Sequence, residues 1–453
     1  MRIVVIGGVA AGMSAASQAR RRDPACEVIV LERGRDISYS ACGMPYNIGD
    51  PRRALDDLVI LDAATARNER GIDVRTRHEV VGIDLARRLV NVVNLDTAQA
   101  YALTWDRLVL ANGAAAVRPA LSGIDQPGVF VLRDLDDARS IKQHFAEAEV
   151  TGAIVVGAGY IGMEMADVLH GMGIAVTMLE KLGHVLPGFA PAIVEVARGE
   201  LDRQGVRVHT GTSLLSVQRD AADLVVRTDG GEFRAQLVIV SVGTRPDVAL
   251  AAKAGIELGA SGAIAVDAAL RTSAPDVYAA GDCAEAQHLV LDRPVWIPLG
   301  TTANKQGKVA GANAAGGDER FGGIVGSAGF KLFDLEIART GLGDAEIGRA
   351  GIDAVEAVSQ HHSRAKSYPG AKPITTVVYA ERGSGRLLGA QMIGGDTVAK
   401  RIDVFATALH AHMTLAQVEA LDLSYAPPFA PVYDPVLIAA SVGVKALAKQ
   451  RRP

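Results

Sequence analysis

The same glycine-rich turn occurs twice in the sequence, each time directly after a short apolar run. The first is Gly7–Gly12 (GGVAAG), which follows Ile3–Ile6, and the second is Gly157–Gly162 (GAGYIG), which follows Ile154–Val156. In a dinucleotide-binding turn of this spacing, the first glycine permits the bend, the second lets the backbone approach a pyrophosphate and the third lets the helix pack on the strand. The pattern therefore predicts two strand–turn–helix units with phosphates at the helix N-termini, although Val9 replaces the middle glycine of the first turn.

An acidic residue stands at a suitable distance beyond each turn. Glu32 lies 20 residues after Gly12, and Glu180 lies 18 residues after Gly162. Such an acid, at the end of the next strand, can accept a hydrogen bond from a ribose hydroxyl. A carboxylate at Glu180 would repel a 2′-phosphate, which favours NADH over NADPH, but the adjacent Lys181 leaves NADPH open.

The apolar runs predict an α/β chain with two Rossmann-like dinucleotide-binding domains and a C-terminal α+β domain. The runs 108–110 and 237–240 are apolar on both faces, as expected of buried parallel strands. Each is soon followed by glycine, which suits a crossing between domains. Beyond residue 320, strand-like stretches are followed by helical periodicity over 398–409. We expect the tail, 438–449, to be solvated, with a short amphipathic helix that carries basic residues at its end as the alternative.

One of the three cysteines stands in a segment suited to redox chemistry. Cys42 lies within Ser38–Gly49 (SYSACGMPYNIG), before a predicted helix, whereas Cys26 and Cys283 fit inert buried positions. A helix N-terminus lowers the pKa of a thiol, so we expect a Cys42 thiolate. Because no second cysteine follows closely, Cys42 must cycle with an external sulfur or as a sulfenic acid. Two nucleotide sites and one thiol suggest an electron path from nicotinamide through flavin to sulfur.

The composition bounds the partners of the chain. Its 453 residues are 49% hydrophobic and 22% charged, with a net charge of −4. This balance is ordinary for a globular protein and favours neither nucleic acid nor an anionic membrane. No apolar run approaches the roughly 20 residues of a membrane span, and the first strand starts without a charged leader, so we expect a cytoplasmic protein. Three scattered cysteines predict neither a disulfide scaffold nor a metal site.

Two later segments suit a flavin at the first site. The stretch 272–282 ends an apolar strand in Gly281-Asp282. An acid there can bind a ribityl hydroxyl, with an ordinary turn aspartate as the alternative. The segment 298–304 starts a predicted helix, whose N-terminal dipole can stabilise negative charge on a reduced flavin ring.

Together these residues resemble the flavin-dependent pyridine-nucleotide–disulfide oxidoreductases over nearly the whole chain. The Cys42 segment looks like the single-cysteine branch, which contains coenzyme A-disulfide reductases, NADH-dependent persulfide reductases, and NADH oxidases and peroxidases. Tyr425–Phe429 (YAPPF) and Tyr368–Gly370 (YPG) are similar to segments of the coenzyme A-disulfide reductases. The resemblance implies FAD at the first site and NAD(P)H at the second. It also implies a homodimer in which the third domain of one subunit completes the active site of the other.

On this resemblance we expect a discontinuous FAD-binding domain over 1–113 and 245–320, an NAD(P)H-binding domain over 114–244 and a dimerisation domain over 321–453. The resemblance implies that Cys42 is the redox thiol. It implies that Tyr368 and Tyr425 of one subunit donate hydrogen bonds to the leaving or attacking sulfur at the active site of the other subunit. Packing at a dimer interface is the alternative for both.

The implied cofactor site is larger than the two turns. Tyr160 matches a tyrosine that shields the flavin until nicotinamide displaces it, with simple packing as the alternative. Glu164 matches an acid near the nicotinamide, with a helix-surface acid as the alternative. The implied cofactor-binding residues are Gly7, Gly8, Ala11, Gly12, Glu32, Arg33, Val80, Ala111, Gly113, Gly157, Gly159, Tyr160, Ile161, Gly162, Glu164, Glu180, Gly243, Gly281, Asp282, Thr302 and Ala303.

A coenzyme A site is also implied, and two departures weigh against it. Arg21 and Arg70 suit phosphate groups, although 20–22 also resembles a solvated helix end. Ala41 stands where the coenzyme A-disulfide reductases usually have asparagine, and Tyr433 stands where they can carry lysine. The matching positions are Ser14, Gln18, Arg21, Ser38, Arg70, Asn304 and Tyr433.

Three functions follow as hypotheses. The first is a reductase that passes electrons from NAD(P)H through FAD to Cys42 and on to a small disulfide or persulfide, such as that of coenzyme A. The second is an NADH oxidase or peroxidase in which Cys42 cycles through sulfenic acid. The third is a flavoprotein that senses nucleotides or binds a partner without turnover.

Overall fold

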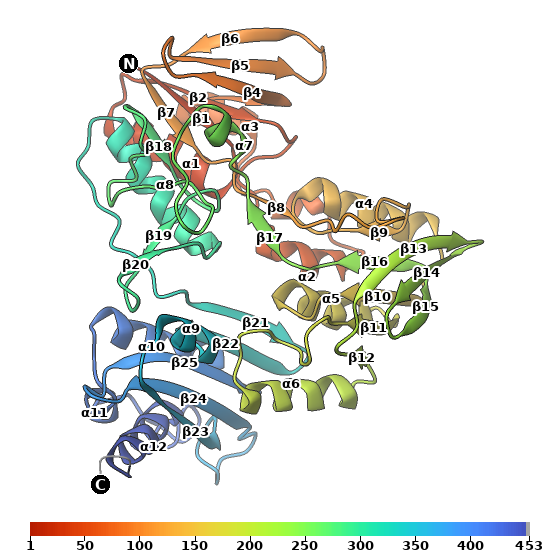
Figure 1. Cartoon of the computed structure of the whole chain (residues 1–453), viewed down its shortest axis with the longest axis vertical. Helices are drawn as coiled ribbons and strands as arrows, with labels where there is room; N and C mark the ends of the chain where they lie inside the picture. The colour runs from red at the N-terminus through yellow and green to blue at the C-terminus, as the bar shows by residue number, and fades with distance from the viewer. Residues whose placement is uncertain (450–453) are drawn as a thin grey trace.

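The computed structural model describes residues 1–449, and these form three lobes (Figure 1). In this view the N-terminal lobe lies at the top, the second lobe at the right and the C-terminal lobe at the bottom. Within this described part, no helix combines the length and the apolar character needed to cross a membrane. Residues 450–453, the end of the expected dimerisation domain, lie outside the described residues.

A parallel sheet of order β3-β2-β1-β7-β18 forms the centre of the N-terminal lobe. Alternate side chains of β1 point to opposite faces: Ile3 and Val5 pack with α1 and α8, and Val4 and Ile6 pack with the β4–β6 sheet. Because both faces are covered, these four buried positions of the strand are all apolar. The elements of this lobe are β1 (Arg2–Ile6), α1 (Ala10–Arg22), β2 (Glu27–Glu32), the 3-10 helices η1 (Ala41–Gly43) and η2 (Leu55–Leu58), α2 (Met44–Ile48), α3 (Ala63–Arg70), β3 (Asp73–Thr76), β4 (His78–Asp84), β5 (Leu89–Asn94), β6 (Ala100–Thr104), β7 (Arg107–Leu110), α7 (Ala249–Lys253), β18 (Val277–Ala279), β19 (Ala286–His288), β20 (Arg293–Val295) and α8 (Gly300–Ala314).

The second lobe repeats this plan. Its sheet has the order β12-β11-β10-β16-β9. β10, which precedes the second glycine turn, lies between β11 and the later strand β16, just as β1 lies between β2 and β7. A small antiparallel sheet, β13-β14-β15, contributes to the core on one face. The elements are β9 (Val129–Phe130), α4 (Leu135–Glu147), β10 (Gly152–Val156), α5 (Tyr160–Gly171), β11 (Ala175–Leu179), α6 (Pro191–Arg203), β12 (Arg207–His209), β13 (Leu214–Asp220), β14 (Asp223–Thr228), β15 (Gly231–Ala235) and β16 (Leu237–Val240).

The chain crosses between these two lobes on a pair of adjacent strands. β8 (Ala114–Ala116) pairs antiparallel with β17 (Thr244–Pro246). Each strand follows a glycine with positive φ, Gly113 at +76° and Gly243 at +108°. The buried parallel strands predicted over 108–110 and 237–240 are confirmed as β7 and β16. The domain boundaries that we propose at 113/114 and 244/245 therefore fall at this strand pair.

The C-terminal lobe is an antiparallel sheet of order β21-β22-β25-β24-β23. α10 packs on β22 and β25, α12 packs on β23 and β24, and α6 of the second lobe also contacts β24 and β25. The elements are β21 (Ala328–Leu332), β22 (Leu335–Gly341), α9 (Asp344–Ala350), β23 (Ala354–His362), β24 (Pro373–Glu381), β25 (Leu387–Gly394), α10 (Val398–His410), α11 (Leu415–Glu419) and α12 (Pro435–Lys449).

The prediction that the tail is solvated is wrong, and the alternative, a helix, is what the structure shows. Residues 438–449 belong to α12, whose Val436, Ala440 and Leu447 are buried. These side chains recur at helical spacing and pack against β23, β24 and α11. The basic residue Lys449 remains at the end of the helix, but the apolar stripe makes the segment part of the core.

Candidate active site between two dinucleotide-binding lobes

The two glycine turns have the same geometry. Gly7 and Gly157 adopt φ of +99° and +100°, and their N–H groups donate to Leu31 O at 2.9 Å and Leu179 O at 2.8 Å. A Cβ on Gly12 would lie 1.8 Å from Gly7 O, which is a severe overlap. These positions therefore require glycine, for the bend and for the close approach of helix to strand.

Each acid reaches back to its own turn. Glu32 accepts hydrogen bonds at 2.6 Å from the backbone N–H groups of Gly8 and Gly34. Glu180 accepts at 2.8 Å from Ala158 N and from the N–H group two residues beyond itself. Burial raises the pKa of Glu32, and its two backbone hydrogen bonds oppose that rise. Since a carboxylate has about four acceptor directions, each acid retains capacity for a ribose hydroxyl.

The residues at both turns fit a dinucleotide. A Cβ built on Gly159 meets nothing within 4 Å, so the space in front of the second turn is open to a ligand. Gly159 and Val9 stand at the start of α5 and α1, where the first N–H groups lack partners within the helix and can bind phosphate. At the first site, Gly281 approaches Ala11 so closely that a Cβ there would lie 2.7 Å from the Ala11 Cβ.

Cys42 lies in η1, between these two sites, and its side chain is exposed. Nearby protein atoms nevertheless displace water, so burial raises the pKa of the Cys42 thiol. Glu164 and Asp282 raise that pKa further, while Arg133 lowers it. The pKa of Cys42 is therefore raised and not lowered as the sequence predicts, because burial and then the two carboxylates disfavour the thiolate. The helix that follows the thiol, α2, spans only Met44–Ile48.

Two side chains that sequence reasoning missed connect these groups. The Tyr46 hydroxyl donates to Glu164 Oε1 at 2.7 Å and joins α2 to α5. Arg133 donates to Asp282 Oδ2 at 2.9 Å and to Ala114 O at 2.7 Å. Tyr46 stands inside the Cys42 segment, but no motif marks Arg133, because its partner lies 149 residues away.

Tyr160 is held at the boundary between the second and third lobes. Its ring stacks on Phe330 with centroids 4.9 Å apart and meets Phe189 edge-on at 6.0 Å. Burial raises the pKa of Tyr160. The arrangement gives the ring a defined packing site, and shielding of a flavin stays a prediction.

The expected coenzyme A residues are brought together only in part. The Ser14 hydroxyl of α1 donates to Asn304 Oδ1 of α8 at 2.8 Å. Arg21 and Arg70 are exposed at the ends of α1 and α3, as phosphate partners should be, and Arg21 Nε bonds to the backbone of its own helix. Ser38 has φ of +44° and its N–H group donates to Gly8 O at 3.0 Å, while Gln18 is half-buried.

The three expected tyrosines of the C-terminal lobe are exposed, with Tyr433 67%, Tyr425 47% and Tyr368 39% accessible. In Figure 1, α11 and α12, which flank Tyr425 and Tyr433, lie at the foot of the molecule, far from α2, which follows Cys42. Within one chain the two helices that flank Tyr425 and Tyr433 therefore lie apart from α2.

The other expected cofactor residues lie around the two turns. Arg33 is exposed and faces Glu79 at 3.9 Å. Val80 is buried in β4, so only its backbone is available. Ile161 lies in the first turn of α5, and its side chain is exposed. Ala111 and Gly113 follow β7, Gly162 packs on Gly157, Gly243 follows β16, and Thr302 and Ala303 are buried in the first turn of α8.

Two dinucleotide-binding lobes that meet at a single exposed thiol define a nucleotide-dependent oxidoreductase. Residues 1–307 match the family described as pyridine nucleotide-disulphide oxidoreductase, and residues 327–435 match the dimerisation domain of that family. The chain belongs to the pyridine nucleotide-disulphide oxidoreductases. It is an enzyme of that class, with sites for FAD and NAD(P)H and a C-terminal dimerisation domain, as the sequence analysis predicts.

Several named relatives match along almost their full length. An "NAD(P)H sulfur oxidoreductase (CoA-dependent)" of Pyrococcus abyssi is 37% identical, over 97% of both chains. An "NADH oxidase" of Methanocaldococcus jannaschii is 34% identical, over 99% of this chain and 100% of its own. A "Coenzyme A disulfide reductase" of Staphylococcus haemolyticus is 30% identical, over 94% and 96%. The solved NAD-dependent persulfide reductase from A. fulgidus is 37% identical with a TM-score of 0.94, over 98% of this chain and 83% of its own.

Proposed function

We propose that the enzyme uses NAD(P)H to reduce a small disulfide or persulfide, such as that of coenzyme A, through Cys42. The observation that carries this proposal is the contrast among the three cysteines. Cys26 and Cys283 are buried, and burial raises the pKa of Cys283 to about 12, whereas Cys42 is exposed beside Glu164, Asp282 and Arg133. Relatives named for sulfur, persulfide and coenzyme A disulfide support the substrate class.

The chemistry at Cys42 is thiol–disulfide exchange. The Cys42 thiolate attacks one sulfur of the substrate, a bond forms between the two sulfur atoms, and the other half of the substrate leaves as a thiolate. Two electrons and a proton then cleave the mixed disulfide, which releases the second thiol and restores the Cys42 thiolate. When bound, NAD(P)H and FAD supply that electron pair.

The neighbours of Cys42 have separate tasks in this proposal. Arg133 stabilises the thiolate, since its guanidinium lowers the pKa of Cys42. Tyr46 holds Glu164 by its hydrogen bond, and this fixes the carboxylate of α5 relative to the Cys42 segment. The protein acts as a homodimer, and the hydroxyl groups of the partner subunit's Tyr425 and the partner subunit's Tyr368 donate to the departing sulfur.

The proposed substrate site is centred on α1 and α8 and includes residues from other elements. Ser14 and Asn304, which are joined at 2.8 Å, offer polar groups at the surface. Arg21 and Arg70 offer guanidinium groups to phosphates, and Gln18, Ser38 and Tyr433 complete the proposed coenzyme A site. Stable binding of coenzyme A belongs to this proposal, as does the assignment of the individual cofactor-binding residues.

One experiment tests the function directly. The purified protein is followed for NADH and NADPH consumption with coenzyme A disulfide, coenzyme A persulfide, hydrogen peroxide or air alone. We expect turnover with a sulfur substrate to exceed aerobic oxidation, and the Cys42→Ser variant to lose it. The flavin absorbance of this variant should be retained, which separates loss of the thiol from loss of the cofactor.

The second candidate function is NADH oxidase or peroxidase, favoured by the "NADH oxidase" relative. In that case Cys42 reacts with an oxygen species to form a sulfenic acid. Rapid oxidation by air that is indifferent to disulfides, with a dimedone adduct at Cys42, would replace the first proposal by this one.

A further inference from the structure

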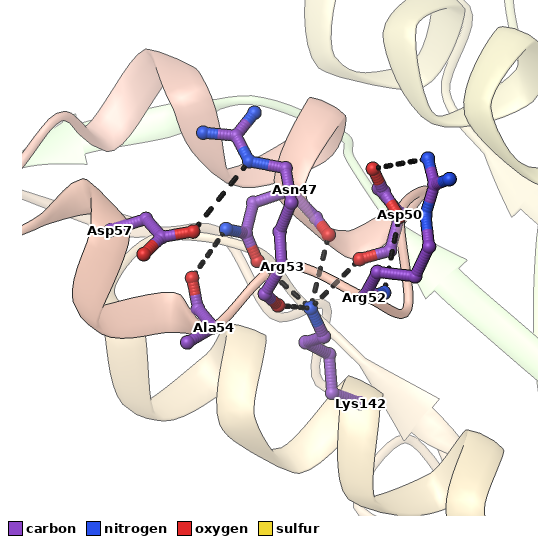
Figure 2. Close-up of polar contacts among 7 residues, drawn as sticks. All are labelled: Asn47, Asp50, Arg52, Arg53, Ala54, Asp57 and Lys142. Atoms are coloured by element: carbon purple, nitrogen blue, oxygen red, sulfur yellow. Dashed lines mark hydrogen bonds and ion pairs between the residues drawn. The ribbon is translucent and has the colours of Figure 1, made fainter.

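Lys142 joins α4 to the segment that follows Cys42 (Figure 2). Its Nζ lies 2.6 Å from Arg53 O, 2.9 Å from Asn47 Oδ1, 3.1 Å from Asn47 O and 3.3 Å from Asp50 O. The ammonium has three protons, so one of them is shared between two of these acceptors. The main-chain acceptors lie at and just beyond the C-terminal end of α2, whose first residue, Met44, comes two positions after Cys42.

Asn47 shows that the hydrogen bonds of Lys142 reach into the interior of the protein. Asn47 is completely buried, at 0% exposure. Its Nδ2 donates to Ala54 O at 2.7 Å, and its Oδ1 accepts from Lys142. Both ends of a buried amide are thus satisfied, and removing the lysine leaves a buried acceptor without its donor. Lys142 therefore completes a network that ties α2 to the turn over 50–54.

The same helix region also governs the charge around Cys42. Arg133, just before α4, pairs with Asp282 at 2.9 Å, and Arg139 of α4 pairs with Asp36 at 2.7 Å. α4 follows the chain crossing into the second lobe, while Asp36 and Asp282 belong to the first. Lys142 thus holds the backbone of residues 47–53 against α4. Arg133, which comes just before α4, is the arginine near the thiol.

We propose that Lys142 is a positioning residue for the redox step. It holds the segment 42–54 so that Cys42 keeps its position relative to Arg133 and Glu164. The inference rests on the proposed function of Cys42. Lys142 touches neither the thiol nor the glycine turns of the dinucleotide sites. Its loss should therefore impair the sulfur half of the reaction and spare the reduction of the flavin.

The test compares Lys142→Met with a matched control, Arg52→Met. Arg52 lies in the same turn and pairs with Asp50 at 2.9 Å, but its side chain is 87% exposed. Three measurements are made on the flavin-loaded proteins: amide hydrogen exchange over 43–54, anaerobic reduction of the flavin by NADH, and kcat and KM for the sulfur substrate. Lys142→Arg, which retains a cationic donor, is the rescue variant.

For Lys142→Met we expect faster exchange over 43–54 and a fall in kcat of about tenfold, because small displacements of a reacting group are costly. KM and the rate of flavin reduction should stay within about twofold of the wild type. Arg52→Met should match the wild type throughout, and Lys142→Arg should recover part of the lost kcat.

Unchanged exchange over 43–54, or a loss of flavin reduction as large as the loss of kcat, would overturn the inference. If Lys142→Met does not fold, Asn47→Ala serves in its place, since it removes one acceptor and leaves the main-chain carbonyls to the lysine. A wild-type protein without Cys42-dependent turnover would refute the proposed function instead. The positioning role of Lys142 is then tested by amide hydrogen exchange over 43–54 and by the alkylation rate of Cys42. Both must differ between Lys142→Met and Arg52→Met.

Discussion

Burial raises the pKa of Cys42, and three charged side chains from separate parts of the chain add to that rise or oppose it. Glu164 and Asp282 disfavour the thiolate, and Arg133 favours it. Because Arg133 also pairs with Asp282, this arginine reduces the effect of one of the two carboxylates. Of these two carboxylates, Glu164 is the one that Arg133 does not pair with, and Tyr46 donates a hydrogen bond to it.

Two substitutions should shift the pKa of Cys42 in opposite directions. Glu164→Gln removes a negative charge and keeps an acceptor for Tyr46, so the pKa of Cys42 falls and alkylation below that pKa becomes about threefold faster. Arg133→Met removes the positive charge and should slow alkylation. The pH–rate profile of iodoacetamide labelling at Cys42, followed by mass spectrometry, measures both. Identical profiles in the two variants would show that these charges do not control the thiol.

At this scale the sequence predicts what a short motif encodes and misses what the fold brings together. Glu32 and Glu180 are found from spacing alone, because one strand and one helix separate each acid from its turn. The contact of Lys142 with Asn47 spans 95 residues, and that of Arg133 with Asp282 spans 149. Neither pair leaves a local signal, since an exposed-looking lysine or arginine on a helix is common. The electrostatic surroundings of Cys42 are unpredictable for the same reason.

Among the elements, α1 and α8 make the closest helix contact that bears on the site. A Cβ on Gly311 would lie 2.1 Å from Ala15 O, and one on Gly307 would lie 2.2 Å from Ala11 O. The two backbones can approach so closely only because α8 carries glycine at these positions. Since α1 begins at the first glycine turn and Ser14 meets Asn304 across this contact, the spacing of the helices sets both the first dinucleotide site, which we propose for FAD, and the proposed substrate surface.

The same substitution should therefore have opposite effects in two helices. Gly311→Ala forces α1 and α8 apart and should destabilise the protein by about 2 kcal/mol, with weaker retention of FAD. Gly199→Ala is the control: Gly199 lies inside α6, and its Cβ would meet nothing within 4 Å. There alanine should stabilise by about 0.5–1 kcal/mol through its helix propensity. Thermal unfolding and the flavin-to-protein absorbance ratio measure the pair, and equal effects would contradict this account of the helix contact.

The elements that the sequence predicts well are those whose pattern is repeated or complete within a few residues. β1 and β10, with their turns and helices, follow from apolar runs next to glycine. α12 was predicted only as the alternative to a solvated tail, because its apolar stripe, which includes Val436, Ala440 and Leu447, can be interpreted only together with the surface on which it packs. β23 and β24 supply that surface only after the antiparallel sheet of the third lobe has formed.

Among the residues that the structure describes, the most exposed aromatic side chains lie on the C-terminal lobe. Phe429 is 76% and Tyr433 67% accessible, and Tyr425 lies in the same segment. Exposed aromatic groups of this size are typical of a protein–protein interface, and residues 327–435 match a dimerisation domain. A symmetric dimer would cover them. The proposed sharing of the active site needs the third lobe of one copy to reach the thiol of the other, because α11 and α12 lie far from α2 within one chain (Figure 1).

Mixed dimers decide whether the active site is shared between subunits. Cys42→Ser lacks the thiol and Tyr425→Ala lacks the phenol, so each homodimer should be impaired. If the partner subunit's Tyr425 serves Cys42, a mixed dimer has one site with both groups intact and one with neither. After unfolding and refolding of an equal mixture, sulfur-linked turnover should return to about a quarter of the wild-type value, since half of the dimers are mixed. If both groups acted within one chain, every site in the mixture would lack one of them, and turnover would stay at the level of the impaired homodimers.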